Sequence, residues 1–120
     1  MIGRFPLFTD ADVHGPLIKA LVRRGWDVVR SVDTFPEGTD DDVLFEHAAK
    51  AGSVFVTNDQ PAVDIAHRWL SEGRGFRGMI TWPQTHYKYM TYGEIVEAFE
   101  MLAAMEDPFE KQPIRYITPR

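Results

Sequence analysis

Acidic side chains follow two short apolar runs of this sequence, and carboxylates so placed can bind a cation. Residues 5–9 lead directly into Asp10 and Asp12, and residues 54–57 are followed closely by Asp59. Carboxylate oxygens are the protein ligands that Mg²⁺ and Mn²⁺ prefer. A divalent ion held by them can activate water and neutralise charge on a phosphodiester. A metal-dependent hydrolytic site is therefore the first hypothesis.

A third group of acids stands between these runs, at residues 40–42. We expect Asp40, at the start of the helix that follows the second strand, to lie over the same edge as Asp10 and Asp59. Three carboxylates brought so close repel one another unless some bind a proton or all share a cation. A second metal ion would need further carboxylates. The acids available for it are Asp12 and Asp64.

Each aspartate also has a simpler interpretation, because Asp is among the preferred residues for capping the start of a helix. Asp10 or Asp12 could cap the first helix, and Asp59 could cap the helix that begins near Pro61. An acid in a first helical turn, such as Asp40, is favoured by the helix dipole in any case. The joint position of Asp10 and Asp59 at one sheet edge is what favours a site.

Each residue that could contact a substrate likewise has a functional interpretation and a purely structural one. Thr57 either orients Asp59 or is an ordinary β-branched strand residue, and His14 either serves the acidic site or lies on the surface. Lys88 lies in an aromatic loop, residues 82–92, which could stack and steer RNA bases or pack against the last helix or a partner. A short basic run could contact phosphate or simply face solvent: Arg68, Arg74 and Arg77.

The elements that must position these residues alternate between strand and helix. Hydrophobic periodicity predicts strands at residues 5–9, 26–32, 54–57 and 79–82, and helices at residues 14–24, 40–51, 61–70 and 92–105. Thr39 is the predicted N-cap of the second helix, and Thr91 with Glu94 forms a predicted capping box. Residues 114–117 could add a short edge strand.

This alternation predicts an α/β fold, a three-layer sandwich with a mostly parallel central sheet of four to five strands. If the strand at residues 5–9 lies between those at 26–32 and 54–57, the winding direction reverses there. Open parallel sheets bind ligands at such a switch point. The acidic side chains follow two of the strands that flank it.

The composition bounds the class of protein. A chain of 120 residues with 44% hydrophobic residues fits a single domain, residues 1–120, and the absence of cysteine excludes thiolate zinc sites and disulfides. The net charge of -5 argues against nonspecific attraction to nucleic acid, although a carboxylate metal site adds negative charge of its own. With no signal peptide or membrane span in the sequence, we expect a cytoplasmic protein without membrane contact.

Several stretches together resemble the short PIN-like proteins related to the ribonucleases of toxin–antitoxin pairs. The resemblance covers about residues 5 to 82 and rests on PLFTDADV, RRGWDVV, TDDDVLFEHAAKAG and SVFVTND, in that order. It implies a PIN-like fold and RNA cleavage dependent on Mg²⁺ or Mn²⁺, with RNA as substrate and an antitoxin-like protein as partner. By this resemblance Asp10 is the first metal-binding aspartate, Asp40 the helix-start acid and Asp59 the aspartate of a Thr-x-Asp turn.

Two positions depart from the pattern of these proteins. Ala11 and Pro61 stand where a second acid is often found. A one-metal site is one alternative, and a degenerate domain that binds RNA or an antitoxin without cutting is another. Asp12 and Asp64 are the possible substitutes for the missing acids.

A receiver-like phosphoacceptor domain is a further alternative. Acids after the first strand, Asp59 after the third and Thr81 at the end of the fourth also suit that arrangement. Such a domain needs a lysine at the end of a fifth strand, where this chain has the sequence Gln112-Pro113-Ile114. The sequence therefore favours the metal-dependent ribonuclease over the phosphoacceptor.

Overall fold

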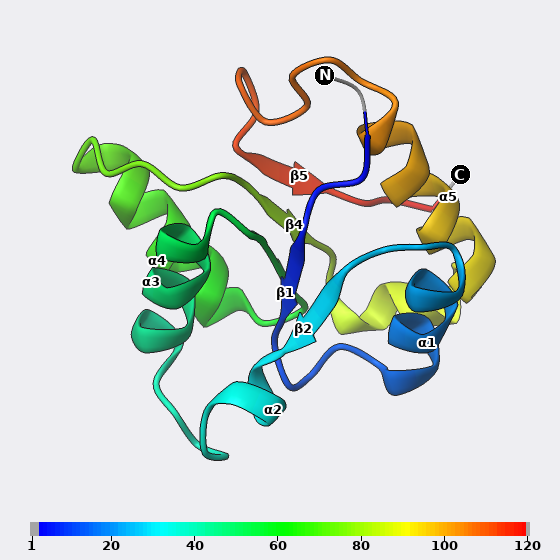
Figure 1. The fold of residues 1–120 in the computed structure, drawn as a ribbon, viewed down its shortest axis with the longest axis horizontal. Helices are drawn as coiled ribbons and strands as arrows, with labels where there is room; N and C mark the ends of the chain where they lie inside the picture. Colours follow the sequence, from blue (N-terminus) through cyan, green and yellow to red (C-terminus); the bar gives the residue numbers. More distant parts are fainter. Residues whose placement is uncertain (1–2, 120) are drawn as a thin grey trace.

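The computed structural model describes residues 3–119, which form a five-stranded parallel sheet between two layers of helices (Figure 1). The elements in chain order are β1 (Leu7–Thr9), α1 (Gly15–Arg23), β2 (Val28–Arg30), α2 (Ser31–Thr34), α3 (Asp41–Ala51), β3 (Val54–Thr57), α4 (Gln60–Ser71), β4 (Met79–Thr81), the 3₁₀ helix η1 (Gln84–Lys88), α5 (Tyr92–Ala103) and β5 (Ile114–Tyr116). The predicted α/β class and three-layer architecture are confirmed.

The strand order is β2-β1-β3-β4-β5, with every neighbouring pair parallel. Phe8 of β1 pairs with Val29 of β2 on one side and with Phe55 of β3 on the other. The winding direction therefore reverses at β1 and β3, as predicted, and this is the switch point of the sheet. The predicted edge strand near the C-terminus is also confirmed, because β5 pairs with β4.

The sheet is buried on both faces, and alternate residues of the central strands serve different cores. Leu7, Val54 and Val56 pack on the side of α1 and α5, whereas Phe8 and Phe55 pack on the side of α3 and α4. This alternation follows from the strand geometry, in which successive side chains point to opposite faces. Figure 1 shows the two helix pairs on either side of the sheet. Burial on both faces holds the ends of β1 and β3 in place.

The second strand is shorter than predicted. The sequence pattern extends over residues 26–32, but β2 covers only Val28–Arg30, and Ser31–Thr34 turns into the short helix α2. As an edge strand, β2 pairs only with β1, and none of its side chains is fully buried. Its length is therefore set weakly by core packing.

The start of α3 differs from the prediction by one residue. Asp40, and not Thr39, occupies the N-cap position, and α3 begins at Asp41. The Thr39 hydroxyl donates to the Pro36 carbonyl at 2.6 Å instead. At α5 the predicted capping box is confirmed, because Thr91 accepts from the Glu94 amide and Glu94 accepts from the Thr91 amide.

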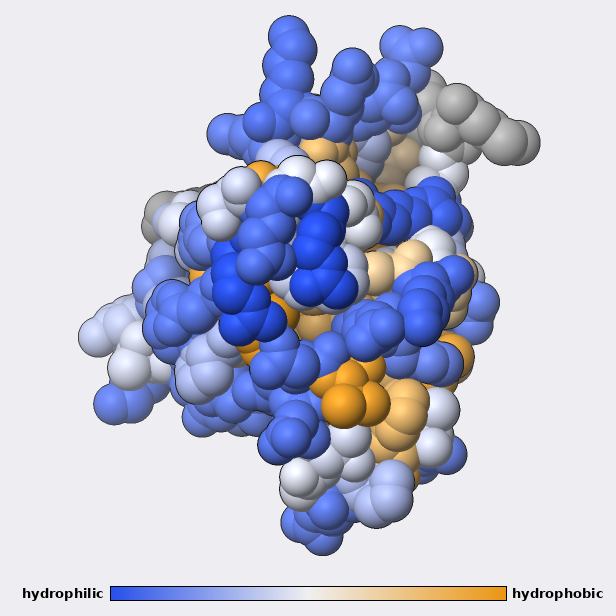
Figure 2. Space-filling model, turned by 90° about the vertical axis from the view of Figure 1, so that its left-hand side faces the viewer, coloured by the Kyte–Doolittle hydropathy of each residue, from blue (hydrophilic) through white to orange (hydrophobic). Residues whose placement is uncertain are grey.

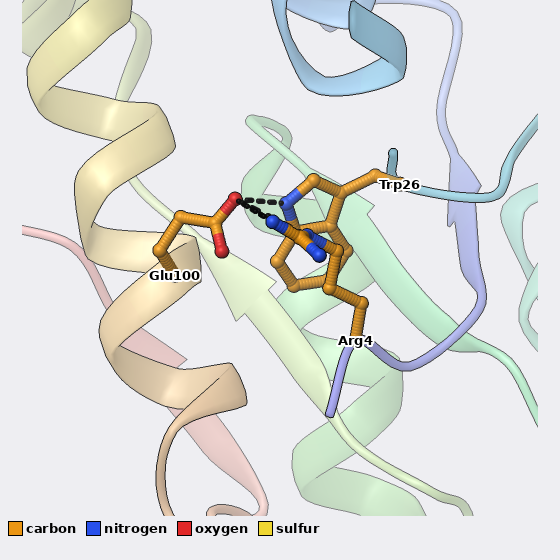
Figure 3. Close-up of polar contacts among 3 residues, drawn as sticks. All are labelled: Arg4, Trp26 and Glu100. Carbon is orange, nitrogen blue, oxygen red and sulfur yellow. Dashed lines mark hydrogen bonds and ion pairs between the residues drawn. The ribbon is translucent and has the colours of Figure 1, made fainter. Parts of the chain in front are cut away.

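Glu100 ties α5 to the segments that precede β1 and β2 (Figure 3). Its Oε1 accepts hydrogen bonds from Arg4 Nε at 3.2 Å, Arg4 Nη2 at 3.1 Å and Trp26 Nε1 at 3.0 Å. The Trp26 ring also packs edge-on against Phe99, with ring centroids 5.8 Å apart. These contacts help to fix α5 against the sheet.

The outer face of α3 and α4 is mainly hydrophilic, with smaller apolar areas between the hydrophilic side chains (Figure 2). Ion pairs lie on it: Arg68 of α4 with Asp42 of α3, and Lys50 with Glu46 at 2.9 Å within α3. This face is suited to contact with water. Among residues 3–119, no helix is sufficiently long and apolar to cross a bilayer.

Candidate metal centre

Three carboxylates converge at the carboxyl ends of β1 and β3. Oxygen atoms of Asp10, Asp41 and Asp59 all lie within 4.8 Å of one another. Asp10 directly follows β1, Asp59 follows β3 after one intervening residue, and Asp41 is the first residue of α3. Since neighbouring parallel strands end at the same sheet edge, the sequence positions of Asp10 and Asp59 predict that they meet, and the structure brings them together.

Asp10 is the best-anchored member of this carboxylate triad, with only 7% of its surface exposed. Its Oδ1 accepts from the Ala11 amide at 2.8 Å, and its Oδ2 accepts from the Thr57 hydroxyl at 3.0 Å. The same Thr57 oxygen accepts from the Asp59 amide at 3.0 Å. Thr57, which is fully buried, thus links the two aspartates and orients them.

Helix capping does not explain Asp59. Asp59 occupies the N-cap position of α4, but its side chain makes no capping hydrogen bond. The same is true of Asp40 at the start of α3. A capping aspartate accepts from the amide two or three residues on. The Asp59 carboxylate lies beside Asp10 and Asp41 instead.

The triad has no basic partner within residues 3–119. The ion pairs in this part of the chain use other acids, namely Asp42, Glu46, Glu72 and Glu100. Oxygens that share one octahedral Mg²⁺ at about 2.1 Å are about 3–4 Å apart, which is close to the spacing of the triad. The donors are all carboxylates, the ligand type that suits Mg²⁺ and Mn²⁺. A divalent ion therefore fits this site in both charge and chemistry.

Asp41 joins the triad, whereas the predicted Asp40 does not. Asp40 is exposed and Asp41 is half-buried. Asp41 lies three, four and seven residues before Leu44, Phe45 and Ala48, the buried residues of α3, so it shares their helix face. The packing of these residues on the sheet therefore places Asp41, and not Asp40, beside Asp10 and Asp59.

Burial and crowding of negative charge raise the pKa of one carboxyl of the triad and of one beside it. Burial raises the pKa of Asp41, and the charges of Asp10 and Asp59 raise it further. Burial, followed by the same two charges, raises the pKa of Asp12 to about 6. Asp12 Oδ2 is buried without a hydrogen-bond partner, while Oδ1 accepts weakly from the Asn58 amide at 3.5 Å. Asp12 thus adds a fourth carboxyl beside the triad.

The pKa of Asp12 predicts how the stability of the metal-free protein depends on pH. The folded chain holds the Asp12 proton up to about pH 6, whereas the unfolded chain releases it near 3.8. Asp12 therefore does not reduce the free energy of unfolding below about pH 4. As the pH rises through about 6, the folded protein has to bury the charged carboxylate, and the free energy of unfolding falls. With EDTA present, the melting temperature of the wild type should fall relative to that of Asp12→Asn between these pH values. A constant difference between the two proteins would contradict the raised pKa.

Replacing Asp41 should separate repulsion from metal binding. Without metal, Asp41→Asn removes one of three mutually repelling charges, so the melting temperature should rise by about 1–4 °C. With Mn²⁺ present, the stabilisation of the wild type by bound metal should be largely absent from this variant. Asp40→Asn is the matched control, since the Asp40 side chain makes no capping hydrogen bond and lies outside the triad. Thermal melts of the three proteins with and without Mn²⁺ measure both effects. The assignment of Asp41 fails if Asp40→Asn, and not Asp41→Asn, loses the stabilisation by Mn²⁺.

The other predicted metal ligand, Asp64, lies apart from the triad. It is exposed on α4, and its carboxylate accepts from Gln60 Nε2 at 3.0 Å, one turn earlier. Asp12 and Asp64 were the two predicted additional metal ligands. Asp12 lies close to Asp10 and Asp59, whereas Asp64 is a surface residue. Asp12, and not Asp64, is thus the additional acid close to the triad.

The predicted substrate-binding residues lie at different edges of the sheet. Arg74 and Arg77 precede β4 and so lie near its amino end, away from the triad. Arg74 stacks over the Trp69 ring at 3.7 Å, and Arg77 Nη1 donates to the Gly52 carbonyl at 3.0 Å. Thr57, at the end of β3, lies within the triad, and Lys88, in η1 after β4, lies at the same carboxyl edge.

Asn58 and Tyr87 are site residues that the sequence interpretation did not single out individually. The Tyr87 hydroxyl donates to Asn58 Oδ1 at 2.7 Å, and Asn58 Nδ2 donates to the Trp82 carbonyl at 3.0 Å. The Tyr87 ring stacks on His14, with centroids 3.7 Å apart and planes 8° from parallel. Their sequence separation of 29 residues left no local signal for the hydrogen bond between Tyr87 and Asn58. The aromatic loop is thus packed directly against the acidic edge.

Comparison with known proteins found no relative on which to test these assignments. No family model, no curated protein and no solved structure matches the chain.

Proposed function

We propose that this chain is a PIN-like, metal-dependent endoribonuclease. The observation that carries the proposal is the carboxylate triad of Asp10, Asp41 and Asp59, which lies at the switch point of a parallel sheet without a basic partner in the described chain. The resemblance to PIN-like proteins supports it, because Asp10 and Asp59 match the metal-binding aspartates of that pattern. In this proposal Asp41, and not Asp40, is the helix-start acid that binds the metal.

The triad would hold one Mg²⁺ or Mn²⁺ ion. Bound there, the ion supplies an acidified water and a positive charge next to the phosphodiester. The chain's own contribution is to hold the ligands: Thr57 fixes Asp10 through its hydroxyl and Asp59 through its backbone amide. Asp12 is the additional carboxyl that could accept a proton at this edge. With Pro61 in place of a second turn acid, the donor set favours one tightly held ion over two.

RNA would approach across the loop that follows β4. Lys88, Tyr89 and Tyr92 are exposed there, with Tyr89 exposing 68% of its surface. A lysine can contact phosphate, and exposed aromatic rings can stack on unpaired bases. These side chains line a surface recess of about 480 Å³. An antitoxin-like partner would have to cover this edge to block the reaction.

The test is RNA cleavage by the purified protein with Mn²⁺, with Mg²⁺ and with EDTA. We expect cleavage with either metal, none with EDTA, and loss of at least about 100-fold in rate for Asp59→Asn. Asp64→Asn is the control, since it makes the same change at an exposed aspartate outside the triad. Cleavage that persists at the wild-type rate in Asp59→Asn, or in EDTA, would refute the proposal. Metal binding without cleavage would favour a degenerate RNA-binding or interaction domain.

The strand order gives specific support to the phosphoacceptor alternative, since β2-β1-β3-β4-β5 is also the order of flavodoxin-like sheets such as receiver domains. Against it, β5 ends at Tyr116 and is followed by Ile117 and Thr118, with no lysine to contact a phosphoryl group. Incubation with acetyl phosphate and Mg²⁺, read by intact mass, separates the two functions. We expect no phosphorylation of Asp59, and a stable phosphorylated form would favour the alternative.

A further inference from the structure

We infer that Asn58 and Tyr87 are positioning residues that hold the turn carrying Asp59, so that the η1 loop sets the affinity of the carboxylate triad for metal. This inference rests on the proposed metal site. The turn after β3 consists of Thr57, Asn58 and Asp59. Thr57 and Asp59 belong to the triad and its hydrogen bonds, but the side chain of Asn58 points to the other side of the turn, toward η1.

The Asn58 side chain is anchored at both of its ends. Its Oδ1 accepts from the Tyr87 hydroxyl at 2.7 Å, and its Nδ2 donates to the Trp82 carbonyl at 3.0 Å. The residue is 8% exposed, so these bonds are shielded from water. A buried amide with both polar atoms paired has a single favourable orientation. The turn between Thr57 and Asp59 is therefore held by residues that follow β4.

The Tyr87 side chain is itself held from several directions. Its ring stacks on His14 with centroids 3.7 Å apart and lies edge-on to Trp82 with centroids 5.9 Å apart. The His14 amide donates to its hydroxyl at 3.4 Å. Burial raises the pKa of Tyr87 to about 12, so the hydroxyl stays protonated and remains a donor to Asn58 near neutral pH.

Asn58 also reaches the acid next to Asp10 through its backbone. The Asn58 amide lies 3.5 Å from Asp12 Oδ1, a weak hydrogen bond. A shift of Asn58 would thus move Asp59, its neighbour in the chain, and would also change the contact with Asp12. Hydrogen-bond partners that orient metal ligands typically contribute about 10- to 100-fold to metal affinity. Tyr87 and Asn58 are placed to make such a contribution without touching the metal.

The test compares Tyr87→Phe with Tyr89→Phe. Both remove one hydroxyl and keep the ring, but of these two hydroxyls the described contacts include hydrogen bonds only for that of Tyr87. We expect Mn²⁺ affinity, measured by calorimetry on the folded protein at 25 °C, to fall about 10-fold or more in Tyr87→Phe and to stay unchanged in Tyr89→Phe. A purely structural role would lower the melting temperature of Tyr87→Phe and leave its Mn²⁺ affinity equal to that of the wild type, and that result would overturn the inference.

A double-mutant cycle with Asn58→Ala tests whether the two residues act as one unit. If Tyr87 acts through Asn58, adding Tyr87→Phe to Asn58→Ala should weaken Mn²⁺ binding no further. Additive losses would mean that Tyr87 acts by another route, and the inference would be wrong.

If the wild type does not bind Mn²⁺, the proposed function is refuted. Whether Tyr87 holds the turn can still be measured, by amide hydrogen exchange in the metal-free protein. In Tyr87→Phe, exchange at the Asn58 and Asp59 amides should accelerate about two- to tenfold, with Phe55 in β3 unchanged. Equal exchange in wild type and variant would show that the hydroxyl does not hold the turn.

Discussion

Asp10→Asn is expected to weaken Mn²⁺ binding by at least about 100-fold and to reduce RNA cleavage to the background rate. Asp10 is the buried member of the carboxylate triad, and both of its oxygens already accept a hydrogen bond, from Ala11 and from Thr57. A cation at the triad would be attracted by the negative charge of this carboxylate, which asparagine lacks. Calorimetric titration of wild type and variant with Mn²⁺ measures the loss directly.

The fold should survive this substitution, which makes its effect interpretable. Asparagine has the shape of aspartate, its Oδ1 can accept from the Ala11 amide, and the Thr57 hydroxyl can turn to accept from its Nδ2. Circular dichroism should therefore be unchanged. Asp64→Asn, at the exposed aspartate bonded to Gln60, should bind Mn²⁺ as the wild type does. Wild-type Mn²⁺ affinity in Asp10→Asn would remove the triad as the metal site.

Gly78→Ala is expected to destabilise the fold by about 1–3 kcal/mol, since overpacking in a buried position costs about this much. A Cβ at residue 78 would lie 2.4 Å from Phe109 Cγ and 2.5 Å from Phe109 Cδ1. The Phe109 ring is 9% exposed and packs edge-on against Phe5, with centroids 5.1 Å apart. The Gly78 carbonyl accepts from the Phe55 amide at 3.0 Å, which limits how far the backbone can move away. Urea denaturation should show a lower midpoint with an unchanged slope.

Gly75→Ala is the control for this prediction. It adds the same methyl group three residues earlier, where no atom lies within 4 Å of the new Cβ. In a Phe109→Ala background the added methyl at residue 78 should cost little, because the ring that it meets is gone. Equal midpoints for Gly78→Ala and Gly75→Ala would contradict the close approach of Phe109.

The alternation of apolar strands and amphipathic helices could be predicted from the sequence. A strand that is buried on both faces needs consecutive apolar residues, and this pattern is visible locally. Val54–Thr57 is apolar throughout and becomes a central strand, and Thr91 with Glu94 caps α5 as its spacing predicts. Strand β2 was overestimated, because an edge strand with one neighbour has little burial to define its ends. The α2 helix that follows it carried no distinguishable pattern.

The site could be predicted in part. Asp10 and Asp59 were predictable since parallel strands end at one edge, so acids after neighbouring strands must lie close together. The sequence analysis chose Asp40, whereas the structure places Asp41 in the triad. Successive side chains of a helix point about 100° apart, so the rotation of α3 about its axis decides which of the two acids faces Asp10 and Asp59. The exposed Val43 and the buried Phe45 show that phase.

By itself, then, the sequence determined the α/β class and the place of an acidic site at the ends of β1 and β3, because both follow from local pattern and strand direction. Tertiary structure alone decided which acids meet and what holds them. Asp41 was selected by the packing of α3, Asp64 was left on the surface of α4, and Arg74 and Arg77 were placed near the opposite edge of the sheet. The bond from Tyr87 to Asn58 spans 29 residues and exists only because β4 lies beside β3. Contacts between distant segments depend on how whole elements pack, and no local pattern records them.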